Sequence, residues 1–243
     1  MTLLISLIIH STFIVVAKSL LIAGCNVFIT GRNKLKLDAA AAELTEDDAN
    51  HGEVQIFQGD VTDEESVCEL FDLVIDTYGQ IDLLINNAGI SIPGSTDSME
   101  LKDFRRVMDV NVIGPFLCSR EAIRRMKERG KGGRIVNIGS LSAQSPRPES
   151  CSYCTSKYAL LGMTNSLSLD CRGHDIAVGI IHPGNVMSAL LTEEEVRERG
   201  RTEGFMSAQD VSSCVLAMAL LPYHANILEM TVIPTKQPFV GRG

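Results

Sequence analysis

The sequence predicts an α/β protein with a doubly wound parallel sheet, built as a single domain over residues 1–243. Short β-rich segments alternate with longer segments of helical periodicity, and small or polar residues follow most of the β-rich segments directly. Such alternation implies right-handed crossovers and a sheet covered by helices on both faces. Apolar residues make up 45% of the chain, which is enough for a substantial core.

The first elements fall within residues 1–23, where Lys18 is the only charged residue. A buried strand followed by a buried helix explains this apolar segment. A membrane anchor is the alternative, although the stretch before Lys18 is short for a span of about 20 residues. A secretory signal is not indicated, because the segment lacks a positively charged start. We expect residues 1–16 to form an atypical hydrophobic N-terminus with an atypical first strand.

The remaining elements alternate along the chain. Strands are expected at residues 26–30, 53–58, 81–86, 134–138, 176–182 and 227–233. Helices with one buried face are expected at residues 38–44, 64–78, 104–129, 156–170 and 208–220. The charged segment 192–204 is expected to form an exposed helix or a flap that covers a site as a lid.

Turn residues follow five of the predicted strands. Ligands of doubly wound sheets bind beyond the carboxyl ends of the strands, so these turns predict one site along one rim. Each turn alone would be ordinary, since Gly, Asn, Asp and Pro are common in turns. The segments are 30–33 (TGRN), 59–61 (GDV), 86–89 (NNAG), 139–140 (GS) and 182–184 (HPG).

Charge and cysteine content limit the class of protein. The net charge of −8 argues against a nucleic-acid partner, which would need a clustered basic surface. The seven cysteines are scattered and odd in number, which indicates a reducing, cytoplasmic location. Cys151 and Cys154 have the spacing of a redox pair or of half a zinc site, but no second pair accompanies them. We predict no metal site.

The strongest local signal is Tyr153 with Lys157 four residues later, at the start of a helical segment. Residues four apart share one face of a helix, so the ammonium can lie beside the phenol. A neighbouring positive charge lowers the pKa of a tyrosine from about 10 toward neutrality. The pair therefore predicts a general acid that works near pH 7.

Two further polar residues fit a site around this pair. Ser140 directly follows the strand predicted at 134–138, where its hydroxyl could hydrogen-bond a substrate oxygen. Asn111 lies within the long helical segment 104–129, where asparagine is unfavourable unless its side chain has a specific partner.

Together these residues resemble the short-chain dehydrogenase/reductase family, a Rossmann-type NAD(P)-binding family. The resemblance extends over about residues 17–232 and depends on several motifs in the family's order. They are NNAG at 86–89, N-V-x-G at 111–114, Ser140, Y-x-x-x-K at 153–157 and P-G at 183–184.

The resemblance implies hydride transfer between a nicotinamide and a carbonyl or secondary alcohol carbon. Tyr153 would exchange the proton with the substrate oxygen, and Ser140 would orient that oxygen. Lys157 would lower the pKa of Tyr153 and hold the nicotinamide ribose. Asn111 would keep a water in line with Lys157 and so close a proton relay.

The resemblance also implies the cofactor contacts. The adenine would be contacted by Asp60 and Val61, and the adjoining ribose by Asn87, Ala88 and Gly89. The nicotinamide would be contacted by Pro183, Gly184 and Val186, and the nicotinamide ribose by Tyr153 and Lys157. Arg32 stands where an acidic residue would pair with the 2′-hydroxyl of NAD, so NADP is expected and NAD is the alternative.

The chain departs from the family at its start. The family has a glycine-rich turn where this chain has S-L-I-I-H-S-T-F at residues 6–13, and Gly24 is its first glycine. Bulky residues disfavour both the tight turn and the close approach of phosphate to backbone, so we expect a malformed phosphate cradle. Three explanations stay open: an alternative start of the gene product, a variant that has abandoned cofactor binding, and a hydrophobic leader.

Two readings of function follow. The first is an active NADP(H)-dependent oxidoreductase, and the second is a catalytically silent family member that only associates with related subunits. A homodimer or homotetramer is expected, because the family pairs through helices that here fall at 104–129 and 156–170. The substrate would be a small carbonyl or alcohol compound bounded by loop segments 90–98, 141–150 and 187–204.

Overall fold

The structure is a computed structural model and describes residues 2–6, 11–46, 51–187 and 193–239. Within these residues, seven parallel strands form one sheet in the order β3-β2-β1-β4-β5-β6-β7. The predicted doubly wound sheet is confirmed, and each of the later predicted strands is present with ends shifted by a few residues. The strands are β1 (Thr2–Ser6), β2 (Asn26–Gly31), β3 (Val54–Gln58), β4 (Leu83–Asn86), β5 (Gly133–Ile138), β6 (Ile176–Pro183) and β7 (Glu229–Val232).

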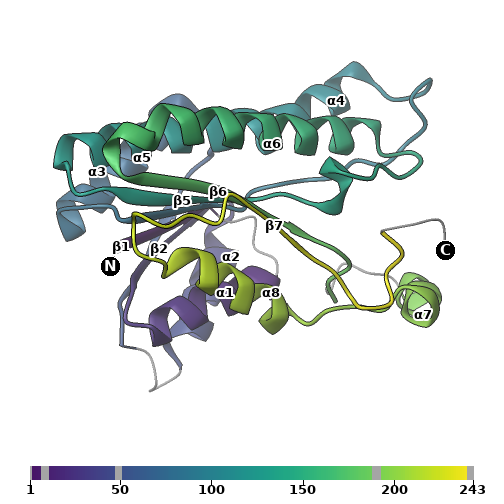
Figure 1. The fold of residues 1–243 in the computed structure, drawn as a ribbon, viewed down its shortest axis with the longest axis horizontal. Helices are drawn as coiled ribbons and strands as arrows, with labels where there is room; N and C mark the ends of the chain where they lie inside the picture. Colours follow the sequence, from purple (N-terminus) through teal and green to yellow (C-terminus); the bar gives the residue numbers. More distant parts are fainter. Residues whose placement is uncertain (1, 7–10, 47–50, 188–192, 240–243) are drawn as a thin grey trace.

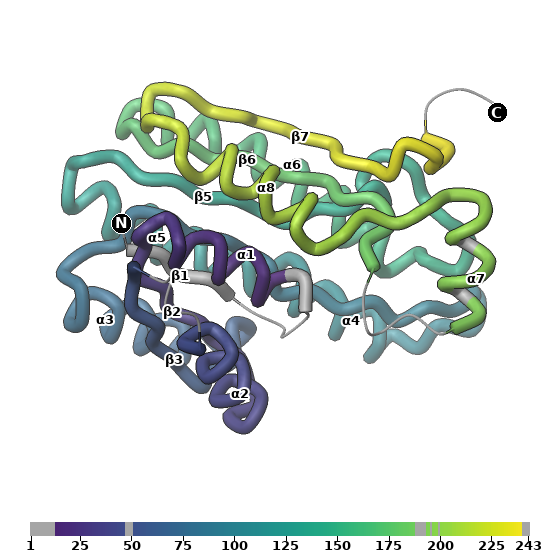
Figure 2. The backbone as a smooth tube through the Cα atoms, turned by 90° about the horizontal axis from the view of Figure 1, so that it is seen from below, coloured from purple at the N-terminus to yellow at the C-terminus, as the bar shows by residue number. Residues whose placement is uncertain are grey.

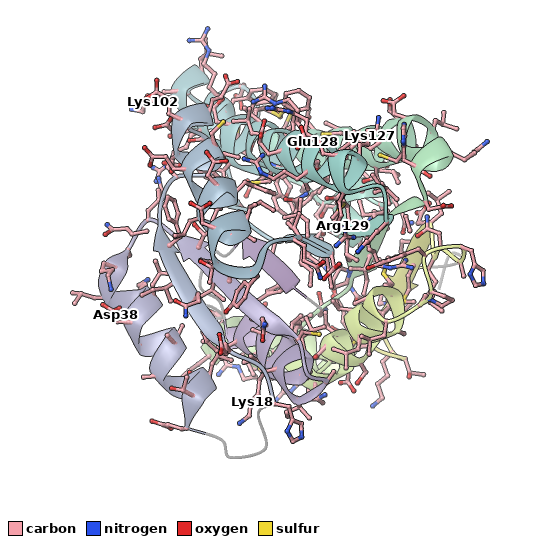
Figure 3. All side chains as sticks on the ribbon, turned by 90° about the vertical axis from the view of Figure 1, so that its left-hand side faces the viewer. Lys18, Asp38, Lys102, Lys127, Glu128 and Arg129 are labelled. Atoms are coloured by element: carbon pink, nitrogen blue, oxygen red, sulfur yellow. The ribbon has the colours of Figure 1, made fainter. Side chains whose placement is uncertain are left out.

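Helices cover both faces of the sheet (Figure 1). On one face lie α3 (Glu64–Tyr78), α5 (Gly114–Arg129) and α6 (Cys151–Cys171). On the other face lie α1 (Ser11–Ile22), α2 (Lys34–Thr45) and α8 (Ala208–Ala219). Figure 2 shows β3 and α2 at one edge of the molecule and β7 at the opposite edge. Figure 3 shows Lys102 and Asp38 projecting outward, and both are exposed.

Each face of the sheet has its own hydrophobic core. Val27, Ile29 and Ile85 point toward α1, α2 and α8, where they join Leu20 and Val215. Phe28, Leu84 and Ile135 alternate with them along the strands and pack toward α3 and α5. Strands buried on both faces explain why the β-rich segments of the sequence are almost continuously apolar.

The strand order reverses direction at β1. This strand pairs with β2 on one side and with β4 on the other, so the connections from β1 and β4 leave toward opposite edges. A crevice opens where such connections diverge, and it lies at the carboxyl ends of the strands. Residues after β4, β5 and β6 therefore reach the same place.

The helix expected at 104–129 is divided in the structure. It consists of α4 (Leu101–Met108), the π-helical turn η1 (Asp109–Ile113) and α5. The N–H of Gly114 bonds to the carbonyl of Asp109, five residues earlier, which is the π-helical pattern. One extra residue per turn cannot be read from apolar periodicity, and such turns often lie at functional sites.

The remaining predicted helices are found. The segment expected at 156–170 is α6, which begins earlier, at Cys151, so that Tyr153 lies in its first turn. The charged segment 192–204 contains α7 (Glu193–Thr202). Among the described helices, none is both long and apolar enough to span a membrane.

Candidate active site

Three of the five predicted turns meet in one cavity of about 540 Å³. It lies beyond the carboxyl ends of β4, β5 and β6, at the point where the strand order reverses. The turns after β2 and β3 do not contribute to its lining. The lining residues are Phe13, Asn87, Gly89, Ile90, Ser91, Ile138, Gly139, Ser140, Tyr153, Lys157, Pro183, Gly184, Val186 and Val211.

Tyr153 and Lys157 lie on the same face of α6, as their spacing predicted. The ammonium Nζ of Lys157 is 5.6 Å from the centroid of the Tyr153 ring. Nζ also donates a hydrogen bond of 2.8 Å to the carbonyl oxygen of Ile138, at the end of β5. This bond ties the lysine to the sheet, and only 4% of Lys157 is exposed.

The predicted lowering of the Tyr153 pKa is not found in this structure. Burial raises the pKa of Tyr153 above 10.0, and a hydrogen bond from Ser140 offsets only part of that effect. Burial also lowers the pKa of Lys157 to about 8. The cause in both cases is burial by surrounding protein, which penalises the charged form of each group and favours the neutral phenol of Tyr153.

Ser140 directly follows β5 and lies beside Tyr153. Its side chain bonds to that of Tyr153, and its Oγ also accepts a hydrogen bond of 3.2 Å from the backbone N–H of Ser142. Ser140 is the N-cap of the short 3₁₀ turn η2 (Leu141–Ala143), which fixes its position at the rim.

His182, at the end of β6, contacts the backbone of Ser140. Its Nδ1 lies 2.9 Å from the carbonyl oxygen of Ser140, and the imidazole is fully buried. Its Nε2 lies 3.4 Å from a carboxylate oxygen of Glu229, and burial lowers the pKa of His182. The sequence placed His182 in a rim turn, but nothing in it indicated a contact with Ser140.

Asn111 occupies the π-helical turn and is completely buried. Its Nδ2 donates to the carbonyl of Ile90 and to Oγ of Ser156, both at 2.9 Å, and its Oδ1 accepts from the N–H of Ile90 at 2.8 Å. Asn111 thus joins the segment after β4 to α6. A Cβ on Gly89 would lie 3.5 Å from Oδ1 of Asn111 and 3.6 Å from Nζ of Lys157, so all three meet at the cavity.

The predicted cofactor residues fall into two groups. Asn87, Gly89, Tyr153, Lys157, Pro183, Gly184 and Val186 line the cavity. Ala88 is buried beside it, while Arg32, Asp60 and Val61 follow β2 and β3, away from the cavity. Arg32 and Asp60 form an exposed ion pair of 3.7 Å.

The part of the cavity at Lys157 fits a hydroxylated ligand. The Lys157 ammonium has three donors, and within the described residues its only hydrogen bond is to Ile138. Two donors stay available in a buried position, where an unfilled donor is costly. No described residue supplies a carboxylate for this ammonium, whereas ribose hydroxyls would accept from it.

Phe13, in the first turn of α1, forms another part of the cavity wall. It is the last residue of segment 6–13, where the resemblance predicted the phosphate turn. The predicted malformed turn falls mainly on residues 7–10, which lie outside the described residues. No local pattern marked Val211 as a cavity residue, because tertiary packing of α8 brings it there.

Comparisons with known proteins agree with this geometry. The chain matches the family model "short chain dehydrogenase" over residues 14–199. It is 32% identical to an NADP-dependent (R)-specific alcohol dehydrogenase of Lentilactobacillus kefiri over 72% of this chain and 69% of the relative. It is 39% identical to an uncharacterized oxidoreductase of Thermotoga maritima, over 56% of this chain and 53% of that protein.

A solved structure has the same fold. A mutant of a Serratia marcescens short-chain dehydrogenase/reductase superimposes with a TM-score of 0.85 at 25% identity, covering 95% of both chains. The matching family model and the oxidoreductase relatives show an NAD(P)-dependent dehydrogenase/reductase. The chain belongs to the short-chain dehydrogenase/reductase family.

Proposed function

We propose that this protein transfers a hydride between NADP(H) and a carbonyl or secondary alcohol compound. The observation that carries the proposal is the single cavity in which Ser140, Tyr153 and Lys157 meet. The name of the L. kefiri relative, an NADP-dependent alcohol dehydrogenase, supports the chemistry. Arg32 after β2 supports NADP, because its guanidinium can pair with a 2′-phosphate once it leaves the exposed carboxylate of Asp60.

Each residue has one task in the reduction. Bound NADPH would supply the hydride to the carbonyl carbon. Tyr153 donates its phenolic proton to the carbonyl oxygen, and its raised pKa keeps that proton in place at neutral pH. When substrate binds, the single O–H of Ser140 turns from Tyr153 to donate to the same oxygen, while its Oγ still accepts from the N–H of Ser142. Lys157 holds the ribose hydroxyls with its two available donors.

Asn111 acts on this site through its neighbours. It fixes the backbone at Ile90 and the side chain of Ser156, and so sets the width of the cavity between β4 and α6. The proton relay through a water beside Lys157 is part of the proposal.

The test of this function separates binding from turnover. NADPH binding is measured by fluorescence titration, and reduction of a panel of ketones is followed at the absorbance of NADPH. Tyr153→Phe is expected to lower kcat at least a hundredfold, because general acid catalysis contributes about 10²–10⁴-fold. Its cofactor affinity should stay within a few fold of the unmodified protein.

A second function is favoured by Phe13 in the cavity wall. If that side chain excludes the phosphates, the protein is a silent family member that assembles with related subunits. The two functions differ in cofactor binding. Absence of binding at millimolar NADPH would contradict the enzyme and support the silent partner.

We propose that copies of the chain pair through α5 and α6. Large apolar side chains on these helices are exposed, including Phe116 at 42% and Tyr158 at 46%. We also propose a cytoplasmic location, because all seven cysteines are free thiols, as a reducing compartment would keep them.

A further inference from the structure

A second cavity of about 450 Å³ opens on the other side of Ser140 and Tyr153. It shares Ser91, Ser140, Tyr153, Pro183 and Gly184 with the first cavity. It does not reach Lys157 but extends to the segment after β7. A volume of this size suits a small organic molecule, so it is the space for the substrate under the proposed function.

Polar side chains outnumber apolar ones in the wall of this substrate cavity. Nine of its fifteen lining residues have a polar or charged side chain, and Arg147 is the only charged one among them. Apolar binding sites usually carry only a few polar groups, so this lining is unsuited to a purely hydrocarbon substrate. The polar members are Ser91, Ser140, Ser142, Ser145, Arg147, Ser150, Tyr153, Asn185 and Gln237.

Arg147 is held in place through one nitrogen. Its Nη2 donates to Oδ1 of Asn185 at 3.2 Å and to Oε2 of Glu203 at 3.0 Å. Asn185 is itself fixed, because its N–H bonds to Oε1 of Gln237 at 2.9 Å and its Nδ2 bonds to Glu203 at 2.6 Å. Glu203 is not part of the cavity wall, so it anchors the arginine from behind.

The rest of the Arg147 guanidinium is available to a ligand. A guanidinium has five N–H donors, and within the described residues Arg147 makes no hydrogen bond through Nη1 or Nε. Nη1 carries two of these donors and Nε one, and each nitrogen can donate a charge-assisted hydrogen bond to a carboxylate oxygen. The side chain is 42% exposed, so an entering molecule can reach it.

We propose that the substrate is a carbonyl compound that carries a carboxylate, and that Arg147 binds this carboxylate while Ser140 and Tyr153 hold the carbonyl oxygen. The three residues line one cavity, so a small oxo acid can contact both ends at once. The inference rests on the proposed function, because it assigns the substrate of the same site.

The test compares oxo acids with their neutral methyl esters. The probes are 4-oxopentanoate, 5-oxohexanoate and 6-oxoheptanoate, each with its ester, using the full chain and NADPH. The readout is the ratio of kcat/KM for acid to kcat/KM for ester. Loss of a charge-assisted hydrogen bond corresponds to about ten- to a hundredfold, so the ratio should reach that range for at least one chain length.

Variants assign the preference to Arg147. Arg147→Gln should bring the ratio close to one, and Arg147→Lys should restore part of it, since lysine keeps the charge but not the planar shape of the guanidinium. Glu203→Gln should keep or increase the ratio, because it removes a competing carboxylate. Arg172→Gln, at an exposed position after α6, removes the same charge elsewhere and should leave the ratio unchanged.

The outcomes distinguish this inference from the proposed function. A ratio near one at every chain length, or a ratio that survives in Arg147→Gln, would overturn the carboxylate site while leaving the reductase in place. If no ketone is reduced at all, the proposed function fails. Binding of 5-oxohexanoate to the protein and to Arg147→Gln, followed by saturation-transfer NMR, then decides the inference separately, since equal binding would refute it.

Discussion

Lys157 is buried at the cavity without a carboxylate beside it in the described part of the chain. Burial penalises its charged form, which lowers its pKa to about 8. Its one protein hydrogen bond, to Ile138, satisfies a single donor. The folded protein would be more stable with an apolar residue at position 157. Binding of a ligand with hydroxyl groups explains why a lysine is present there instead.

Replacing Lys157 should therefore stabilise the protein while removing activity. At pH 7 both the folded and the unfolded chain carry the charge, so the folded state bears the full cost of burying it. Between the folded-state pKa of about 8 and the ordinary lysine pKa of 10.5, only the unfolded chain still holds the proton, so the cost falls as pH rises. Lys157→Met is expected to raise Tm by a few degrees at pH 7, and by less at pH 10.

Differential scanning fluorimetry of both proteins across this range measures the effect. Groups that titrate in both proteins change both Tm values alike, so the difference in Tm between variant and parent reports the effect of Lys157 alone. A difference that stays constant from pH 7 to pH 10 would contradict the assigned pKa shift.

The helices around the site both position its residues and pack in the hydrophobic core. The π-helical turn η1 adds one residue between α4 and α5, which directs Asn111 inward to Ile90 and Ser156. Helix α1 provides both core packing and the cavity wall, since Phe13 belongs to the core and also lines the cavity. Binding affinity and stability are thus opposed at the first turn of α1.

Phe13→Ala should show this opposition directly. Removing the ring opens the phosphate end of the cavity, so NADPH should bind severalfold more tightly. Loss of a buried phenylalanine costs about 3–5 kcal/mol, so the free energy of unfolding should fall. Fluorescence titration measures the first effect and urea denaturation the second.

Leu20→Ala is the matched control on the same helix. Leu20 is fully buried but does not line the cavity, so its removal should lower stability without changing NADPH affinity. Equal affinities of Phe13→Ala and the parent would show that the ring does not restrict the cofactor.

In the whole molecule, the sheet separates two hydrophobic cores, and the cavities of the candidate active site lie along the rim at the carboxyl ends of its strands. The exposed apolar side chains on α5 and α6 lie on the face opposite to α1, α2 and α8. A dimer through this face would leave the rim open, because the cavities lie at the carboxyl ends of the strands.

Phe116→Asp should prevent this pairing. A charge introduced at the centre of an apolar contact is left unpaired and desolvated on association. Light scattering after size exclusion should report a dimer or tetramer of the 26.4 kDa chain for the parent and a monomer for the variant. Leu73→Asp, an equally exposed position on α3, should leave the assembly intact. A monomeric parent would contradict the proposal.

The sequence by itself determined the sheet, the order of the elements and the pairing of Tyr153 with Lys157. These depend on local periodicity, on spacing along one helix and on turn residues at strand ends, all of which are short-range. The same reasoning placed Ser140 and Asn111 near the site. It gave the wrong direction for the Tyr153 pKa, because the effect of burial depends on packing from several elements.

Only the tertiary structure decided what surrounds those residues. Phe13 reaches the cavity from α1, His182 supports Ser140 from β6, and Arg147 meets Glu203 across 56 residues of sequence. Each of these contacts joins side chains from elements that come together only when the helices pack on the folded sheet. The surroundings of the site residues arise only when the whole chain packs. The same packing sets their pKa values and the shape of the substrate cavity.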